Sequence, residues 1–302
     1  MAQENDASVV VGARPVFRFA PSPNGYLHLG HAYSALFNQR LAEETGARLL
    51  LRIENIDPER SRQHFEAALE EDLAWLGLDW EKPPRRQSDH MSDYRAALEE
   101  LTRRGLAYRC FCSRTEIAEA SSRQSNRLRD PDGSPLYPGT CRYLTPEEQA
   151  FRVSTGARFS LRLDMAKALA ETAAPLSYRE FHEFHEGKTV VAEPALWGDA
   201  LIGRRDTPAS YHIACTIDDH NQGVTDVARG VDLESATSLH RLLQALLGLT
   251  TPDYRHHRLV LDDQGRKLSK SQSATSLREL RAQGVTPEGL RDRLARMMSR
   301  AA

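Results

Sequence analysis

Cysteine is scarce in this sequence, with four residues in a chain of 302. So few cysteines exclude a disulfide scaffold as the source of stability in a chain of this length. Long hydrophobic runs are also missing, because no stretch of about 18 apolar residues occurs, and a membrane-spanning helix is therefore not expected. The first fifteen residues carry acids and lack a long apolar core, so they do not resemble a signal peptide. We expect a cytoplasmic protein without a membrane partner.

An excess of charge of either sign is likewise missing, since the formal net charge is −2 at pH 7. The chain as a whole therefore does not attract nucleic acid, and any contact with RNA requires a local basic surface. The length allows one large domain or two modest ones.

The segment 17–31, FRFAPSPNGYLHLGH, predicts a strand at 16–20, a tight turn and the start of a helix. This arrangement directs free backbone N–H groups and the positive end of a helix dipole at one point, which is typical of phosphate binding. His28 and His31 add hydrogen-bond donors there, and Gly30 has no Cβ to obstruct a ligand. An ordinary turn with surface histidines is the alternative interpretation.

Hydrophobic periodicity and capping residues predict further elements of an α/β fold. We expect helices at 28–45, from Asp57, at 92–104, at 235–247 and from Thr286, and strands at 47–53, 211–217 and 259–261.

A second motif, Lys267-Leu268-Ser269-Lys270-Ser271, lies far along the chain. By itself it could be a solvated surface loop. Together with His28-Leu29-Gly30-His31, however, it resembles the signature pair of class I aminoacyl-tRNA synthetases. Leu268 stands where that family usually has Met, and a side chain of similar size should pack equivalently. Other segments resemble the glutamyl branch of the family, namely RFAPSP at 18–23, RIENID at 52–57, YH through DD at 211–219 and GVTDVARG at 223–230.

The resemblance runs from about residue 16 to about residue 275 and implies a domain organisation. It implies a Rossmann-like parallel-sheet catalytic domain at 16–105 and 190–245. It also implies an inserted zinc-binding, acceptor-type subdomain at 106–189 and a helical subdomain at 246–302 that carries the lysine loop. Residues 1–15 would form a leader, and no anticodon-binding domain is expected.

The reaction implied is attack of an amino-acid carboxylate on the α-phosphate of ATP, which is catalysed by positioning and preorganised positive charge. Mg²⁺ is expected with the nucleotide, bound mostly through phosphates and water. By the resemblance, the residues that bind ATP or act in catalysis are His28, Gly30, His31, Lys267, Ser269, Lys270 and Ser271.

A glutamate substrate brings two carboxylates and one ammonium group, and its pocket therefore needs cationic groups and one anionic group. By the resemblance, Glu54 binds the ammonium, while Arg18 and Arg229 bind carboxylates through their planar guanidinium groups. Which arginine reads which carboxylate stays open, and structural ion pairs are the alternative for both. The full expected pocket consists of Arg18, Phe19, Ala20, Pro21, Ser22, Glu54, Tyr211 and Arg229.

Cys110, Cys112 and Cys141 suggest a zinc site, with three reduced cysteines as the alternative. The resemblance supplies Tyr137, at Y-x3-C, as the fourth ligand of a structural zinc ion. Cys215 is expected in the core.

The chain ends soon after the lysine loop, whereas ordinary glutamyl-tRNA synthetases continue into an anticodon-binding domain. It therefore resembles the truncated paralogues of that family that activate glutamate without tRNA and transfer it to queuosine in the anticodon loop of tRNA(Asp). The expected partners are ATP, L-glutamate and queuosine-containing tRNA(Asp), and the protein is expected to be a monomer.

Two alternatives remain: a minimal enzyme that charges tRNA(Glu) or forms glutamyl-adenylate for another acceptor, and a non-enzymatic binding module. A set of arginines could contact the RNA backbone or could equally be a solvated basic face. They are Arg103, Arg104, Arg109, Arg114, Arg123, Arg127 and Arg129.

Overall fold

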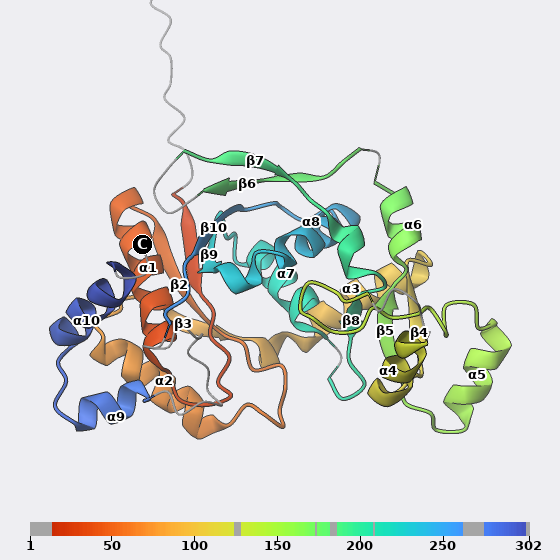
Figure 1. Cartoon of the computed structure of the whole chain (residues 1–302), viewed down its shortest axis with the longest axis horizontal. Helices are drawn as coiled ribbons and strands as arrows, with labels where there is room; N and C mark the ends of the chain where they lie inside the picture. The colour runs from red at the N-terminus through yellow and green to blue at the C-terminus, as the bar shows by residue number, and fades with distance from the viewer. Residues whose placement is uncertain are drawn as a thin grey trace, which may run out of the picture.

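The computed structural model describes residues 14–123, 128–172, 174–181, 186–207, 209–261 and 275–299 (Figure 1). The four functional residues expected from the lysine loop lie outside the described residues, as does nearly all of the expected leader. They are Lys267, Ser269, Lys270 and Ser271.

Within the described residues, a seven-stranded sheet forms the centre of the molecule, in the order β3-β2-β1-β9-β10-β6-β7. All neighbouring pairs are parallel except β6 and β7. The strands are β1 (Val16–Phe19), β2 (Arg48–Ile53), β3 (Glu81–Arg86), β6 (Ser177–Phe181), β7 (Lys188–Val191), β9 (Asp226–Gly230) and β10 (Asp253–His257). The strand order reverses at β1, between β2 and β9, and ligands of open parallel sheets bind in the crevice at such a point. The expected α/β fold with a parallel sheet is confirmed.

Helices cover both faces of this sheet (Figure 1). One face packs against α1 (Leu29–Thr45) and α2 (Gln63–Trp75), with α9 (Leu277–Ala282) and α10 (Pro287–Ser299) beside them. The other face is covered by α3 (Met91–Arg103), α7 (Tyr211–Asn221) and α8 (Ala236–Leu247). Short 3₁₀ helices lie at η1 (Gln87–His90), η2 (Pro194–Trp197) and η3 (Val231–Leu233). The described residues contain no helix with the length and apolar character needed to cross a bilayer.

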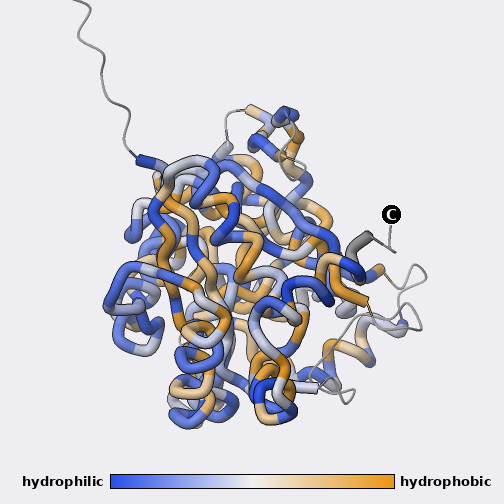
Figure 2. The backbone as a smooth tube through the Cα atoms, turned by 90° about the vertical axis from the view of Figure 1, so that its left-hand side faces the viewer, coloured by the Kyte–Doolittle hydropathy of each residue, from blue (hydrophilic) through white to orange (hydrophobic). Residues whose placement is uncertain are grey.

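Alternation along β1 and β2 explains why the two faces differ. Phe17 and Phe19 point to the apolar layer under α1, since side chains alternate between the faces of a strand. Arg18 and Arg52 project to the opposite face and meet Asp219 of α7. The backbone tube shows hydrophobic segments concentrated in the interior and hydrophilic ones on the outer turns (Figure 2). One face is therefore sealed by apolar packing, whereas the other combines a smaller apolar cluster, which includes Val16 and Leu50, with buried charge.

A second sheet of three antiparallel strands lies at the end of the molecule away from α10 (Figure 1). It contains β4 (Ala107–Cys110), β5 (Ser160–Leu163) and β8 (Leu201–Gly203), with α4 (Arg114–Ser122), α5 (Pro146–Ser154) and α6 (Met165–Ala170) nearby. The expected boundary at residue 190 does not match the sheets. β6 and the first part of β7 lie before residue 190 but belong to the main sheet. β8 lies after residue 190 but belongs to the small sheet.

The strand expected at 211–217 is wrong, because this segment is the helix α7. Residues 213–219 are all buried, so the segment lacks the polar face by which an amphipathic helix is recognised. Cys215 is in the core, as expected.

The helix expected from Asp57 begins instead at Gln63. Asp57 accepts hydrogen bonds from the backbone N–H groups of Glu59 and Arg60, which closes a single turn before the chain extends again. The strand expected at 259–261 is also misplaced, since the sheet uses β10 a few residues earlier.

Two of the helices end at a glycine. Gly46 and Gly248 have φ values of 63° and 66° directly after α1 and α8, in the left-handed region where glycine carries no Cβ penalty.

Candidate functional site

A cavity of about 500 Å³ opens at the carboxyl ends of β1, β2 and β9, where the strand order reverses. Every described residue that the sequence suggested for ATP or glutamate lines it. These residues are Arg18, Phe19, Ala20, Pro21, Ser22, His28, Gly30, His31, Glu54, Tyr211 and Arg229. The structure thus brings together residues from five separate segments of the chain around one space.

His28 and His31 form a reciprocal cap on the N-terminus of α1. The Nδ1 atom of His28 accepts from the backbone N–H of Gly30 at 3.1 Å, and that of His31 accepts from the backbone N–H of His28 at 3.2 Å. A ring nitrogen that accepts a hydrogen bond carries no proton, so in the neutral imidazole the proton is on Nε2. Each ring therefore has an Nε2–H donor, which suits a phosphate ligand beside the helix N-terminus.

Gly30 lines the cavity and also lies against the His28 ring. A Cβ atom at this position would lie 3.0 Å from Cε1 of His28 and 3.2 Å from its Nδ1. The absence of a side chain therefore makes room for the His28 imidazole in its capping position.

Arg18 and Arg52 converge on one carboxylate oxygen beneath the cavity. Asp219 Oδ1 is 2.9 Å from Arg18 Nε and 2.7 Å from Arg52 Nη1. Burial alone would raise the pKa of Asp219, but the Arg18 and Arg52 guanidinium groups hold it at about 2. Arg18 is thus partly engaged in a structural ion pair, although its Nη2 has no hydrogen-bond partner among the described residues.

Glu54 is the anionic group at the cavity wall. It is buried, and its Oε1 accepts a hydrogen bond from Arg52 Nη2 at 3.3 Å. Burial raises the pKa of Glu54, and the nearby Arg52 and Arg18 charges offset the burial only in part. An ammonium group would supply the missing compensating charge, which agrees with the expected role of Glu54.

Arg229, at the end of β9, is held by neutral groups. Its Nη2 donates to Thr237 Oγ1 at 2.8 Å, and its Nη1 lies 3.3 Å from the Tyr211 hydroxyl and 3.4 Å from His240 Nδ1. No carboxylate of the described residues lies within ion-pair distance of Arg229. Burial and the Arg229 charge hold the pKa of His240 well below its ordinary value, so His240 is neutral.

Arg52 and Asp219 lie within the motifs at 52–57 and 211–219, but the sequence alone assigned neither of them a role. The spacing of Tyr211, Cys215 and Asp219, four residues apart, would have placed them on one face of a helix. In a strand these three side chains would also share a face, so the spacing alone does not distinguish a helix from a strand.

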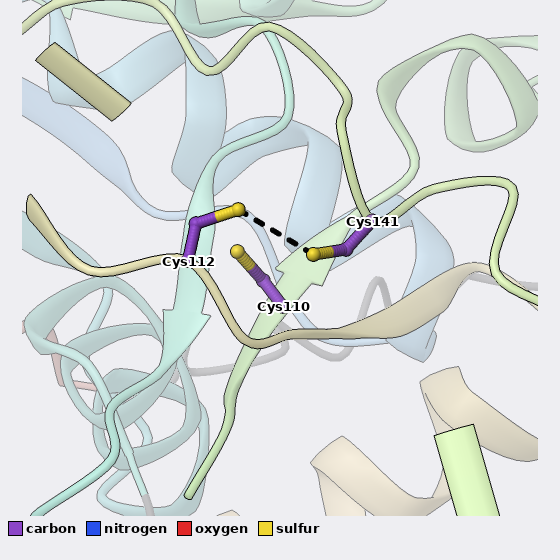
Figure 3. A group of neighbouring side chains, drawn as sticks. All are labelled: Cys110, Cys112 and Cys141. Atoms are coloured by element: carbon purple, nitrogen blue, oxygen red, sulfur yellow. Dashed lines mark hydrogen bonds between the residues drawn. The ribbon is translucent and has the colours of Figure 1, made fainter. Parts of the chain in front are cut away.

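The three expected metal-ligating cysteines form a compact cluster in the small-sheet region (Figure 3). The Sγ atoms of Cys110, Cys112 and Cys141 all lie within 4.8 Å of one another, and those of Cys112 and Cys141 are 3.5 Å apart. Ligand sulfurs around tetrahedral zinc are separated by about 3.8 Å when each Zn–S bond is about 2.3 Å. Hydrogen bonding from Cys141 lowers the pKa of Cys110 to about 4, despite the opposing effect of burial. The cluster could hold a metal ion.

Tyr137 completes this cluster. Its hydroxyl oxygen is 3.5 Å from Cys112 Sγ and accepts from the backbone N–H of Cys141 at 2.8 Å. The Arg162 guanidinium lies over the Tyr137 ring at 4.0 Å from its centroid. Arg162 helps to lower the pKa of Cys110, whereas burial and the neighbouring thiols raise the pKa of Tyr137. Three thiols and one phenol are a donor set that could hold a zinc ion.

The arginines suggested for RNA contact are partly occupied. Arg103 pairs with Glu100, and Arg104 pairs with Glu171. Arg129 donates to the Gly133 carbonyl oxygen. Arg127 lies outside the described residues.

Comparison with known proteins supports this geometry. The family model described as "tRNA synthetases class I (E and Q), catalytic domain" matches residues 16–301. A glutamyl-Q tRNA(Asp) synthetase of Rhodobacter capsulatus is 43% identical over 278 residues, which cover 91% of this chain and 98% of that protein. A glutamate–tRNA ligase 2 of Nitrosococcus oceani is 38% identical over 93% of this chain but over only 58% of its own length.

Among solved structures, a glutamate tRNA ligase from Elizabethkingia meningosepticum in complex with its amino acid is similar, with a TM-score of 0.74 and 25% identity. The match covers 93% of this chain and 60% of that chain.

Proposed function

This chain belongs to the glutamate and glutamine branch of the class I tRNA synthetases, and we propose that it activates L-glutamate with ATP and transfers it to the queuosine base of tRNA(Asp). The observation that carries the proposal is the cavity at the switch point of the sheet, which combines a capped helix N-terminus with buried Arg18, Glu54 and Arg229. As a member of this family the protein is a ligase whose substrates are ATP, an amino acid and tRNA.

Activation requires a substrate carboxylate to be placed next to the α-phosphate of ATP. In our proposal Glu54 binds the ammonium group, and Arg229 with the Nη2 of Arg18 binds carboxylate oxygens. The reactive carboxylate oxygen forms a bond to the α-phosphorus, the bond to the bridging oxygen of the β-phosphate breaks, and pyrophosphate leaves. His28 and His31 donate Nε2–H groups to the phosphates, and Mg²⁺ accompanies the nucleotide.

Lys270 is proposed to stabilise the phosphates in the transition state, with Lys267, Ser269 and Ser271 assisting. We expect Lys270→Ala to abolish ATP–pyrophosphate exchange while leaving the unfolding temperature unchanged, because the residue supplies charge rather than packing. Unchanged exchange would remove Lys270 from the mechanism.

The queuosine acceptor is proposed from similarity that extends over 98% of the Rhodobacter capsulatus relative. The Nitrosococcus oceani ligase is matched over only 58% of its length, so its tRNA acceptor is the second candidate. We also propose that the protein acts as a monomer.

We propose that Cys110, Cys112, Cys141 and Tyr137 hold one structural zinc ion. Four protein ligands leave no open coordination position, so the ion would stabilise the small-sheet region without taking part in the reaction.

The proposal is tested by transfer of labelled glutamate, with ATP, to three RNAs: tRNA(Asp) with queuosine, tRNA(Asp) without it and tRNA(Glu). We expect label only on the queuosine-containing tRNA(Asp), with pyrophosphate exchange in the absence of any tRNA. Label on tRNA(Glu) would identify a minimal glutamyl-tRNA synthetase. Exchange without label on any RNA would indicate another acceptor, and the absence of exchange would leave a binding module.

A further inference from the structure

Behind the cavity wall, a chain of hydrogen bonds joins a carboxylate, an imidazole and a hydroxyl group. Glu180 Oε1 of β6 is 2.7 Å from Nδ1 of His256 in β10, and His256 Nε2 is 3.3 Å from Oγ1 of Thr237 in α8. Thr237 Oγ1 in turn accepts from Arg229 Nη2 at 2.8 Å. Four separate elements therefore meet in one chain of hydrogen bonds that ends at Arg229.

The proton positions in this chain follow from its two ends. Arg229 can only donate, so Thr237 Oγ1 accepts from it and directs its own hydrogen to His256 Nε2. His256 then carries its proton on Nδ1 and donates it to Glu180. Hydrogen bonding from His256, together with the largely exposed Lys188 at 3.0 Å from Oε2, keeps the pKa of Glu180 at about 2. Burial lowers the pKa of His256. Near pH 7 the arrangement therefore consists of a carboxylate, a neutral imidazole and a hydroxyl.

The same order of groups activates a nucleophile in hydrolases, but the surroundings of Thr237 exclude that use. Its side chain is fully buried and does not line the cavity. Its oxygen is already occupied by Arg229. The carboxylate can strengthen only one interaction, which is the hydrogen bond that the hydroxyl oxygen accepts from the guanidinium.

We propose that Glu180, His256 and Thr237 form a positioning triad that fixes Arg229 for binding a carboxylate of the amino-acid substrate. This inference rests on the proposed function, because it deepens the glutamate recognition assigned to Arg229.

The charge of Arg229 explains why a triad positions it and a direct ion pair does not. A carboxylate in contact with Arg229 would neutralise the guanidinium and compete with the substrate. Thr237, Tyr211 and His240 hold it through neutral atoms, and the charge of Glu180 acts through two intervening groups. Arg18 differs, because its Nε is paired directly with Asp219. Arg229 therefore keeps the less neutralised charge of the two pocket arginines.

The test compares Thr237→Val, which removes the hydroxyl at nearly constant shape, with Thr237→Ser, which keeps it. Glu180→Gln removes the distal charge. Arg179→Ala is the matched control, since Arg179 neighbours Glu180 on β6 but its side chain is 60% exposed. We would measure the KM values for glutamate and ATP in pyrophosphate exchange, the Kd of glutamate by calorimetry and the thermal unfolding temperature.

We expect Thr237→Val to raise the glutamate KM and Kd about tenfold and Glu180→Gln to raise them about threefold, because each weakens a hydrogen bond to a charged group. The KM for ATP should stay within about twofold in both variants, and Thr237→Ser and Arg179→Ala should resemble the wild type. A purely structural role would change both KM values together, and the serine variant would not restore the glutamate KM.

The triad is overturned if Thr237→Val binds glutamate like the wild type, or if Glu180→Gln has no effect. A Thr237→Val chain that fails to fold leaves Glu180→Gln as the deciding variant. If the wild type binds glutamate but shows no ATP–pyrophosphate exchange, the proposed activation is refuted. The Kd values of the variants still test the triad in that case. A wild type that does not bind glutamate refutes both.

Discussion

Asp219→Asn is the sharpest perturbation of the buried charges beneath the cavity. Asp219 Oδ1 contacts both Arg18 and Arg52, and its side chain is 7% exposed. Asparagine has nearly the same shape but no charge. The substitution would leave Arg18 without a carboxylate partner among the described residues, whereas Arg52 would keep Glu54.

Two estimates of the free-energy cost of Asp219→Asn are of the same order. Removing one partner of a buried ion pair typically costs about 3–5 kcal/mol, because the other charge stays buried. The pKa of Asp219 is held at about 2, against an ordinary value of 3.8, and this shift corresponds to roughly 2 kcal/mol of stabilisation of the carboxylate. We therefore expect Asp219→Asn to lower the free energy of unfolding by about 3 kcal/mol at pH 7.

The sign of the pH dependence follows from the lowered pKa. A carboxyl group with a lowered folded-state pKa contributes stability that is present above its unfolded pKa and is lost as the pH falls through its folded pKa. The difference in stability between the wild type and Asp219→Asn should therefore be constant above about pH 5 and shrink as the pH falls from about 4 towards 2.

Urea unfolding followed by circular dichroism at several pH values measures this difference. Glu81→Gln is the control, because Glu81 pairs with Arg48 at the surface with 45% of its side chain exposed, and such pairs contribute only about 0–1 kcal/mol. The reasoning is refuted if Asp219→Asn and Glu81→Gln have similar free energies of unfolding, or if the effect of Asp219→Asn does not change between neutral and acidic pH.

Three further perturbations have expected outcomes. Gly30→Ala should raise the KM for ATP about tenfold in pyrophosphate exchange with an unchanged circular dichroism spectrum, because the added methyl group displaces the His28 imidazole; an unchanged KM would contradict the capping role. Cys141→Ser should lose the zinc that elemental analysis finds in the wild type and should unfold at a lower temperature; a metal-free wild type would contradict the zinc site. Burial raises the pKa of Asp72 to about 6. Among the described residues neither carboxylate oxygen has a hydrogen-bond partner, and Arg281 Nη1 lies 3.9 Å from Oδ1. Wild-type stability should therefore fall as the pH rises from about 4 to about 6, and Asp72→Asn should be more stable in urea unfolding by roughly 2 kcal/mol at pH 7; equal stability at pH 7 would contradict this.

Local signals in the sequence predicted the core of the site well. The helix that begins after His28 and ends at Gly46 has its residues, its cap and its end encoded within one segment. The cysteine cluster was likewise predicted from spacing and resemblance, since thiol side chains have few other reasons to gather. Such features depend on contacts between residues close in the sequence or on a chemistry that few residue types provide.

The remaining features depend on tertiary burial, which one sequence does not display. The α7 segment is buried on every side and mixes apolar with polar residues, so it shows no helical period of apolar positions. The contact between Arg229 and Thr237 joins a strand that the sequence analysis did not predict and a helix that it placed correctly. The sequence also does not display which sheet each strand between 160 and 203 joins, because pairing partners decide this.

The path of the chain between the two sheets has a consequence for how the molecule unfolds. After β5 of the small sheet the chain adds β6 and β7 to the edge of the main sheet, and it then returns to close the small sheet with β8. Each sheet thus depends on a segment that is tethered at both ends to the other. Separation of either sheet from the other would pull out an edge strand, so the two regions should melt as one cooperative unit. Loss of a metal ion bound at the cysteine cluster should accordingly also destabilise β10 and, through β10, the wall of the cavity.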